Sequence, residues 1–167
     1  MTSPTRLPPG LQLREQPTPS DREVIRRIIT DSGFFTDSEV DIAVELVDER
    51  LAKGPASGYE FLFIESAGAV LGYACYGEIP CTTGSYDLYW VAVDKSQQRR
   101  GLGKLLVELT EERLRKMDAR KVYIETSTKP LYDPTRAFYD RCGYHEVATF
   151  PDFYAPGDGK VVYEKTL

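Results

Sequence analysis

The sequence has little of what metal sites and disulfide frameworks need. It contains one histidine, His145, and three cysteines, Cys75, Cys81 and Cys142, with no C-x-x-C pair among them. An odd number of cysteines without paired spacing indicates neither a disulfide framework nor a zinc site. Free thiols are typical of a reducing compartment, so we expect a cytoplasmic protein without a bound metal.

Long apolar runs and an excess of positive charge are also missing. No apolar stretch approaches the roughly 20 residues that span a bilayer, and the N-terminus lacks the charged-then-apolar pattern of a signal peptide. The formal net charge of -5 argues against the basic surface that nucleic-acid phosphates require. We therefore expect neither a membrane nor a nucleic acid as a partner, and the acidic balance favours a cationic one.

The 167 residues, 41% of them hydrophobic, fit one domain over residues 1–167 with enough apolar surface for a core. Prolines recur in residues 1–20 and leave room there for a short strand at Leu11 to Arg14. Two helices follow. Ser20 and Asp21 can cap the first, and Thr36 with Glu39 predicts a capping box for the second.

From Tyr59 onward, strand patterns alternate with helical ones. The predicted strands cover 59–65, 69–79, 86–93, 121–126, 144–149 and 161–165, and the predicted helices 102–117 and 134–142. Sequential strands with short turns indicate an antiparallel meander, and a central strand-helix-strand crossover makes the class α+β. Residues 150–159 are expected to form an aromatic loop, which either lines a binding pocket or packs its own aromatic side chains.

A strand passes through a short loop directly into a helix near Gly101 and Gly103. Without side chains, these residues let a ligand approach the main chain, and the first amides of a helix are free donors. The helix dipole also favours an anion, and Arg99, Arg100 and Lys104 add positive charge. The junction therefore predicts a phosphate site.

Two common phosphate loops do not fit this junction. A dinucleotide-binding fingerprint needs a small residue where Leu106 stands, and a P-loop needs Ser or Thr where Leu105 stands. Taken alone, Gly101 and Gly103 are equally compatible with a tight turn beside solvated basic residues.

Three segments carry a wider signal: QRRGLG at 98–103, DLYWVAV at 87–93 and FYDRCGY at 138–144. Together they resemble the Gln/Arg-x-x-Gly-x-Gly/Ala signature, the fourth strand and the Tyr-x-x-x-Gly-Phe/Tyr segment of the GNAT superfamily of N-acetyltransferases. The resemblance implies a mixed, mostly antiparallel sheet of about six to seven strands, flanked by helices, with a splayed central strand pair. It also implies acetyl-coenzyme A (acetyl-CoA) as co-substrate.

The resemblance assigns cofactor contacts to the strand and the loop. The main chains of Val91 and Val93 would hold pantetheine, and an amide near Val91 would polarise the thioester carbonyl. The amides from Arg99 to Lys104 would hold the pyrophosphate. The implied cofactor-binding residues are Val91, Ala92, Val93, Gln98, Arg99, Arg100, Gly101, Leu102, Gly103 and Lys104.

The resemblance also implies catalytic roles. An alkylammonium with a pKa near 10 must lose a proton before it attacks. Asp87 stands where several family members carry a glutamate base, and Glu78 is the alternative. Tyr139 matches the tyrosine that protonates the leaving thiolate. Their alternative roles are a solvated strand carboxylate for Asp87 and a core aromatic for Tyr139, and Tyr132 replaces an asparagine that many relatives carry.

The sequence thus predicts an N-acetyltransferase that acts on a primary amine of a small-molecule or amino-acid-like acceptor, by direct attack in a ternary complex. Two alternatives stay open: a CoA-binding module without turnover, and a protein acetyltransferase acting on a lysine or an N-terminus. The sequence does not decide between a monomer and a homodimer.

Overall fold

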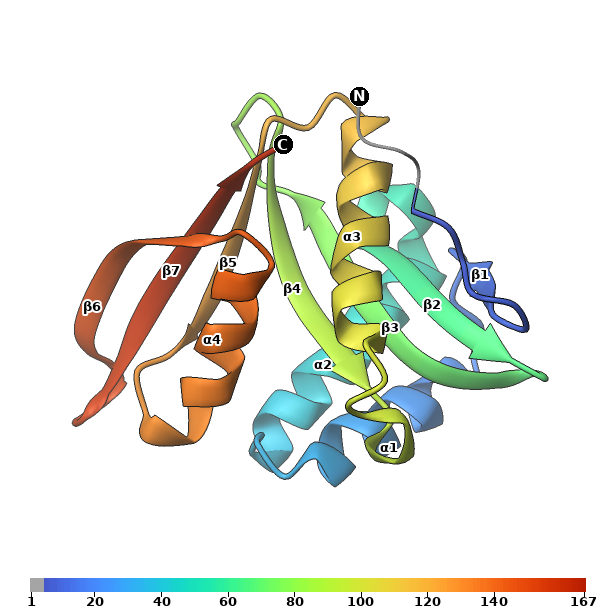
Figure 1. The fold of residues 1–167 in the computed structure, drawn as a ribbon, viewed down its shortest axis with the longest axis horizontal. Helices are drawn as coiled ribbons and strands as arrows, with labels where there is room; N and C mark the ends of the chain where they lie inside the picture. Colours follow the sequence, from blue (N-terminus) through green and yellow to red (C-terminus); the bar gives the residue numbers. More distant parts are fainter. Residues whose placement is uncertain (1–4) are drawn as a thin grey trace.

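The computed structural model describes residues 5–167 and contains a seven-stranded mixed sheet with the order β1-β2-β3-β4-β5-β7-β6 (Figure 1). The strands are β1 Gln12–Arg14, β2 Glu60–Ser66, β3 Ala69–Glu78, β4 Ser85–Val93, β5 Lys121–Ser127, β6 His145–Ala155 and β7 Asp158–Thr166. The helices are α1 Asp21–Ser32, α2 Asp37–Lys53, α3 Leu102–Arg115 and α4 Asp133–Arg141, with short 3₁₀ turns η1 Gly54–Ser57, η2 Lys95–Gln97 and η3 Pro130–Tyr132. The predicted α+β class and mixed sheet are confirmed.

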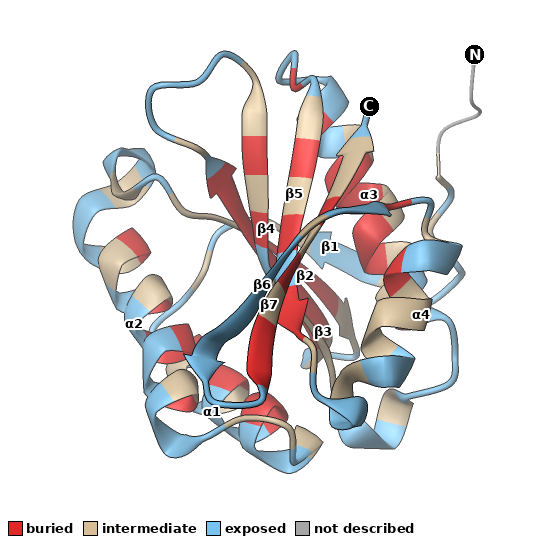
Figure 2. Cartoon of the chain, turned by 90° about the vertical axis from the view of Figure 1, so that its left-hand side faces the viewer, coloured by how far each residue is buried: buried red, intermediate tan, exposed pale blue. Residues whose placement is uncertain are grey.

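Helices cover the sheet on both faces. In Figure 1, α3 and α4 lie in front of the sheet, and α1 and α2 lie behind it. Leu106 and Ile124 belong to the core under α3 and α4, whereas Ile25, Val47 and Phe63 belong to the core under α1 and α2. Buried residues form bands along β4 and β5, and β6 is exposed (Figure 2). None of the helices within residues 5–167 has the length and apolarity needed to cross a bilayer.

The two N-terminal helices begin differently. Thr36 and Glu39 form the predicted capping box of α2, each side chain bonding to the main-chain amide of the other. Ser20 precedes α1, but its side chain makes no capping hydrogen bond, so the predicted Ser20 cap is wrong. Asp21 instead accepts a hydrogen bond from the amide of Thr18 at 2.6 Å, which fixes the segment before the helix.

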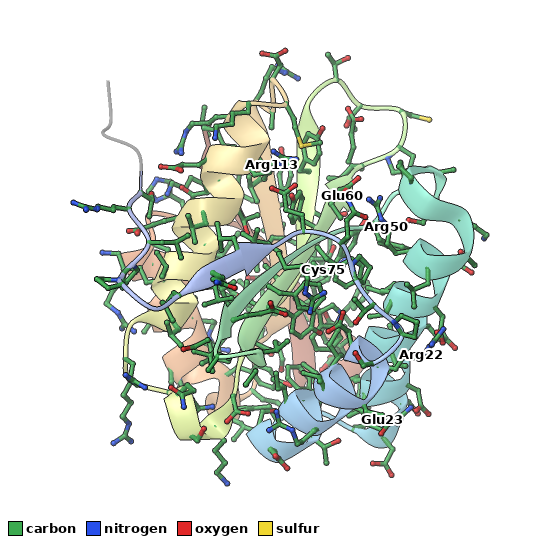
Figure 3. The ribbon with its side chains drawn as sticks, turned by 90° about the vertical axis from the view of Figure 1, so that its right-hand side faces the viewer. Arg22, Glu23, Arg50, Glu60, Cys75 and Arg113 are labelled. Atoms are coloured by element: carbon green, nitrogen blue, oxygen red, sulfur yellow. The ribbon has the colours of Figure 1, made fainter. Side chains whose placement is uncertain are left out.

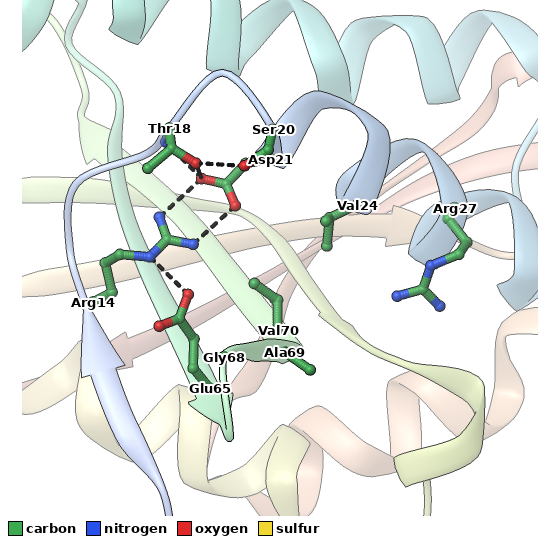
Figure 4. A pocket seen from close by; sticks show the side chains of 10 residues that line it. All are labelled: Arg14, Thr18, Ser20, Asp21, Val24, Arg27, Glu65, Gly68, Ala69 and Val70. Atoms are coloured by element: carbon green, nitrogen blue, oxygen red, sulfur yellow. Dashed lines mark hydrogen bonds and ion pairs between the residues drawn. The ribbon is translucent and has the colours of Figure 1, made fainter.

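Two partly buried ion-pair sites fix the N-terminal elements to the sheet. On α2, Arg50 is 5% exposed and donates to Glu60 of β2 at 3.0 Å (Figure 3). At β1, Arg14 donates two hydrogen bonds of 2.8 Å to Asp21 and one of 2.7 Å to Glu65, beside a hollow of about 320 Å³ (Figure 4). Because the charged groups of this cluster bond to one another, it holds β1, α1 and β2 together.

The predicted aromatic loop at 150–159 is wrong, because most of it is strand. β6 continues to Ala155, and β7 starts at Asp158 after a turn at Gly157, whose φ is 78°. Pro151, a loop signal in the sequence, is tolerated here because β6 is the edge strand of the sheet. The result is a long hairpin that ends beside the C-terminal end of β5.

The expected splayed strand pair is confirmed at β4 and β5. These neighbours run parallel, and their paired residues extend only from Ser85↔Lys121 to Asp87↔Tyr123. Beyond Asp87, β4 turns towards α3 and β5 continues beside β7 (Figure 1). The main chain of β4 therefore lacks a neighbouring strand on one side over its C-terminal half.

Candidate functional site

A cleft of about 950 Å³ opens where β4 and β5 separate. Its lining comes from both strands, from the α1–α2 connection, from α2 and from α4. Of the sequence-predicted site residues, the cleft brings together Asp87, Val91, Ala92, Val93, Gln98 and Tyr139.

A β-bulge in β4 bends the strand away from β5. Opposite β3, Leu88 pairs with Tyr76 and Trp90 pairs with Cys75, so that Tyr89 is an extra residue. A bulge increases the local bend and reverses the alternation of side chains along the strand. Even-numbered residues of β4 face the α3 side before the bulge, and odd-numbered residues face it afterwards.

The main chains of Val91 and Val93 face the gap. The amide of Asp94 donates to the carbonyl of Leu71 at 2.8 Å across the β3–β4 pair. Bonded and non-bonded residue pairs alternate along antiparallel strands. Ala92 therefore bonds towards β3, whereas the polar main-chain groups of Val91 and Val93 point to the side that β5 has left. They can bind an extended ligand as an added strand would.

The α3 N-terminus presents free donors beside this strand edge. Within residues 5–167, the amides from Gly101 to Lys104 donate no hydrogen bond. Gly101 has a φ of 77°, and Arg99 also has a positive φ of 62°, so the loop turns sharply into the helix. A Cβ at Gly101 would meet no atom within 4 Å, which leaves the corner open to a ligand. This geometry suits a pyrophosphate.

Basic side chains surround this corner. Arg100 donates to Gln97 at 2.5 Å, and Lys104 lies 3.6 Å from Glu108 in an exposed ion pair. Both the Arg100 guanidinium and the Lys104 ammonium group stay exposed in these contacts. Gly103 lies against Phe138 of α4, since its Cβ would be 3.5 Å from that ring. The N-terminus of α3 therefore sits close to the helix that carries Tyr139.

Asp87 is half-buried at the last residue paired between β4 and β5. Burial, followed by the charge of Glu125, raises the pKa of Asp87 from 3.8 to about 6, and Lys160 partly opposes the shift. Such a carboxylate is a stronger base than an ordinary aspartate and is still ionised at neutral pH. Asp87 can therefore accept a proton inside the cleft.

Glu78, the alternative base, occupies a different place. It ends β3, is exposed, and accepts a hydrogen bond from the amide of Gly84 at 3.4 Å. It is not part of the lining of the cleft. The structure therefore brings Asp87, and not Glu78, together with Tyr139.

Tyr139 lies in α4 with its ring in the core and part of its surface in the cleft. It is 9% exposed and packs against Phe138, Tyr144 and Tyr163. Burial raises the pKa of its phenol. The hydroxyl thus stays protonated at neutral pH and can act as a donor.

The cleft also contains residues outside the predicted catalytic and cofactor sets, and sequence reasoning missed Glu125 among them. Glu125 of β5 and Tyr154 of β6 reach the cleft, as do Phe34 and Tyr132 from the connections before α2 and α4. Alternation along β5 could have placed Glu125 on the same face as Tyr123. Tyr154 belongs to residues 150–159, for which the sequence left pocket lining as one of two alternatives; it lines the cleft, although from a strand rather than from a loop.

The comparisons with known proteins agree with this geometry. The acetyltransferase (GNAT) family model matches residues 23–144. The structure of a proposed GNAT-family acetyltransferase from Desulfovibrio desulfuricans is 42% identical, with 93% of this chain and 98% of that chain covered and a TM-score of 0.91. No curated protein is significantly similar to the chain in sequence.

More distant structures share the fold. The ribosomal-protein-S18-alanine N-acetyltransferase from Escherichia coli is 18% identical, with 93% of each chain covered and a TM-score of 0.74. An aminoglycoside 6′-N-acetyltransferase complexed with coenzyme A is 16% identical, with 93% of this chain and 96% of that chain covered and a TM-score of 0.71. The family match over residues 23–144 and the 42% identical structure establish that this chain belongs to the acetyltransferase (GNAT) family and is an acyltransferase that uses acetyl-CoA.

Proposed function

We propose that this chain transfers the acetyl group of acetyl-CoA to a primary amine of a small-molecule or amino-acid-like acceptor, by direct attack in a ternary complex. One observation carries the proposal. A single cleft joins the open main-chain edge of β4, a half-buried carboxylate at Asp87 and a buried phenol at Tyr139. Attack by an amine on a thioester needs a hydrogen-bond donor, a base and an acid in such an arrangement.

The described residues fit the donor substrate. Main-chain groups of Val91 and Val93 would bind the pantetheine arm, with Ala92 between them and Gln98 also lining the cleft. The free amides from Gly101 to Lys104, which include those of Leu102 and Gly103, would bind the pyrophosphate together with Arg99 and Arg100. An amide near Val91 would stabilise the negative charge that grows on the thioester oxygen.

Asp87 and Tyr139 divide the proton transfers between them. Asp87 takes a proton from the acceptor ammonium, through a water because an aspartate side chain is short. The free amine forms a bond to the acetyl carbon, and the bond from that carbon to sulfur breaks. Tyr139 then donates its proton to the leaving thiolate, and the surplus proton on the attacking nitrogen returns to the Tyr139 phenolate, which leaves a neutral amide, the free thiol and a protonated Asp87. Glu78 stays a reserve candidate for the base, although it does not line the cleft.

A protein acceptor is the second candidate, because relatives by fold include the Escherichia coli N-acetyltransferase named for ribosomal protein S18. The hydrogen bond from Tyr132 to Phe34 favours the small acceptor, since it joins two walls of the cleft that a polypeptide would have to pass. We also propose that residues 1–167 form one acyltransferase domain and that the protein is cytoplasmic, with a homodimer as the alternative to a monomer. The three free cysteines support the cytoplasmic setting.

The test measures free thiol released from acetyl-CoA with a panel of primary amines, amino acids and lysine-containing or free N-terminal peptides. Amine-dependent thiol release with small amines supports the proposal. If only peptides provoke release, the protein-acetyltransferase reading replaces it. If coenzyme A binds in calorimetry and no acceptor ever provokes release, the chain is a CoA-binding module.

A further inference from the structure

The cleft carries more carboxylates than ammonium groups. Among its lining residues, Glu39, Asp87, Glu125 and Asp158 are acidic and Lys129 is the basic one. Lys129 pairs with Asp158 at 3.1 Å, and Glu39 is held in the capping box of α2. Asp87 and Glu125 are thus the two carboxylates that these contacts leave available to a ligand.

The strand register places these two carboxylates beside each other. Asp87 pairs with Tyr123 across the parallel β4–β5 contact, so their side chains share a face of the sheet. Glu125 lies two residues further along β5 on that same face. Neighbouring strands are about 4.8 Å apart, and two residues advance about 6.6 Å along a strand. These two distances put the Cα atoms of Asp87 and Glu125 roughly 8 Å apart.

Lys160 of β7 neutralises this pair only in part. Its Nζ lies 3.4 Å from Glu125 and 4.0 Å from the centre of the Phe153 ring, so its charge is shared between two partners. The Glu125 side chain stays 51% exposed. Even with Lys160 counted, the carboxylates in and beside the cleft outnumber the ammonium groups by four to two.

Aromatic rings lie close to the same carboxylates. Tyr89 and Tyr59 both line the cleft, with their ring centres 5.5 Å apart, and Tyr89 is 39% exposed. The faces of such rings attract alkylammonium groups. The surroundings of Asp87 and Glu125 therefore suit a flexible cationic chain better than a neutral or anionic acceptor.

We infer that the acceptor carries a second cationic group and that Glu125 is the specificity-determining residue that binds it, while Asp87 serves the nitrogen that reacts. This inference rests on the proposed function, because it takes Asp87 as the base. The spacing of the two carboxylates suits a straight diamine of four or five carbons, or a larger acceptor that contains such a unit.

The test compares butylamine with butane-1,4-diamine, which differ mainly by the second ammonium group. Their binding to the coenzyme A-saturated protein is measured by calorimetry, and their turnover by thiol release. For an ion pair at a half-exposed carboxylate, we expect the diamine to bind about three- to fivefold more tightly. At a pH well above 6, where Asp87 is ionised in both proteins, Glu125→Gln should remove this preference by raising the KM of the diamine more than that of butylamine.

Glu23→Gln is the matched control, because Glu23 is a carboxylate of α1 outside the cleft (Figure 3). It should leave the preference for the diamine intact. Equal affinity of the wild-type protein for both amines, or an equal effect of Glu125→Gln on both, would overturn the inference. If the diamine bound more tightly but neither amine caused thiol release, the result would contradict the proposed function. It would still support the recognition of the second ammonium group by Glu125.

Discussion

The hydroxyl of Tyr132 donates a hydrogen bond to the main-chain oxygen of Phe34 at 3.1 Å, although the two residues are 98 positions apart in the sequence. Their ring centres are 6.0 Å apart, and both residues line the cleft. Tyr132 occupies the position at which many relatives carry an asparagine. Here its hydroxyl is directed to the α1–α2 connection, so the hydrogen bond joins two walls of the cleft.

Tyr132→Phe should weaken acceptor binding without affecting the cofactor. Loss of one hydrogen bond of about 1 kcal/mol predicts a rise in the acceptor KM of roughly fivefold, with an unchanged Kd for coenzyme A. Initial rates and calorimetry measure the two quantities. Tyr154→Phe is the control, because Tyr154 lines the same cleft and its hydroxyl has no hydrogen-bond partner within residues 5–167. A loss of cofactor affinity in Tyr132→Phe would contradict this role.

Tyr139→Phe should lower kcat and leave cofactor affinity almost intact. Removing a general acid costs on the order of 100-fold in rate, whereas the ring and its packing are kept. Tyr163→Phe is the control, since Tyr163 is also buried, lies 6.1 Å from Tyr139 between ring centres and does not line the cleft. Comparable losses of kcat and of coenzyme A affinity would argue for a purely structural Tyr139.

The pH dependence of kcat/KM should show a limb near pH 6. Asp87 accepts a proton only when it is ionised, and burial with the nearby charge of Glu125 raises its pKa to about 6. Activity should therefore fall as the pH drops below 6 and level off above it, before the acceptor amine titrates. Asp87→Asn should remove the limb together with most of the activity. Glu125→Gln should move it to lower pH, and an unmoved limb would show that Glu125 does not act on Asp87.

Local patterns in the sequence predicted the elements that depend on near neighbours. The capping box at Thr36 and Glu39 joins residues three apart, and the turn at Gly101 needs a conformation that glycine adopts at little cost. Both were predicted from the residues themselves. The splayed strands, in contrast, came from the family resemblance, because periodicity does not show which strands separate.

Features set by long-range pairing could not be predicted. The bulge at Tyr89 depends on its register against β3, and it reverses which residues of β4 face the α3 side of the sheet. The extent of β6 depends on pairing with β7, which overrode the loop signal of Pro151. Glu125 enters the site only because β5 parts from β4 after Tyr123. Each of these depends on a partner far away in the sequence.

Asp21→Asn should destabilise the fold, and most clearly near neutral pH. Burial raises the pKa of Asp21, but the hydrogen bonds from Arg14 and Thr18 outweigh this effect and hold the pKa below its ordinary value. A lowered folded-state pKa gives stability that is present above the unfolded-state pKa of about 4 and is lost as the pH falls through the folded value. Urea unfolding at pH 7 should show a loss of about 2 kcal/mol, shrinking at pH 3. A loss that did not change with pH would contradict a charge-dependent contribution.

Gly101→Glu should abolish coenzyme A binding, whereas Gly101→Ala should not. Both substitutions place a side chain at a φ of 77°, which costs about 1 kcal/mol of stability in each variant. The Cβ of either side chain would meet no atom within 4 Å. Only glutamate adds a negative charge in front of the free amides of α3, where it competes with the pyrophosphate and repels it. Calorimetry should therefore separate the variants by more than about 100-fold in Kd, while their thermal unfolding stays alike. If alanine weakened binding as much as glutamate, backbone strain would explain the loss, and the pyrophosphate would have to bind elsewhere.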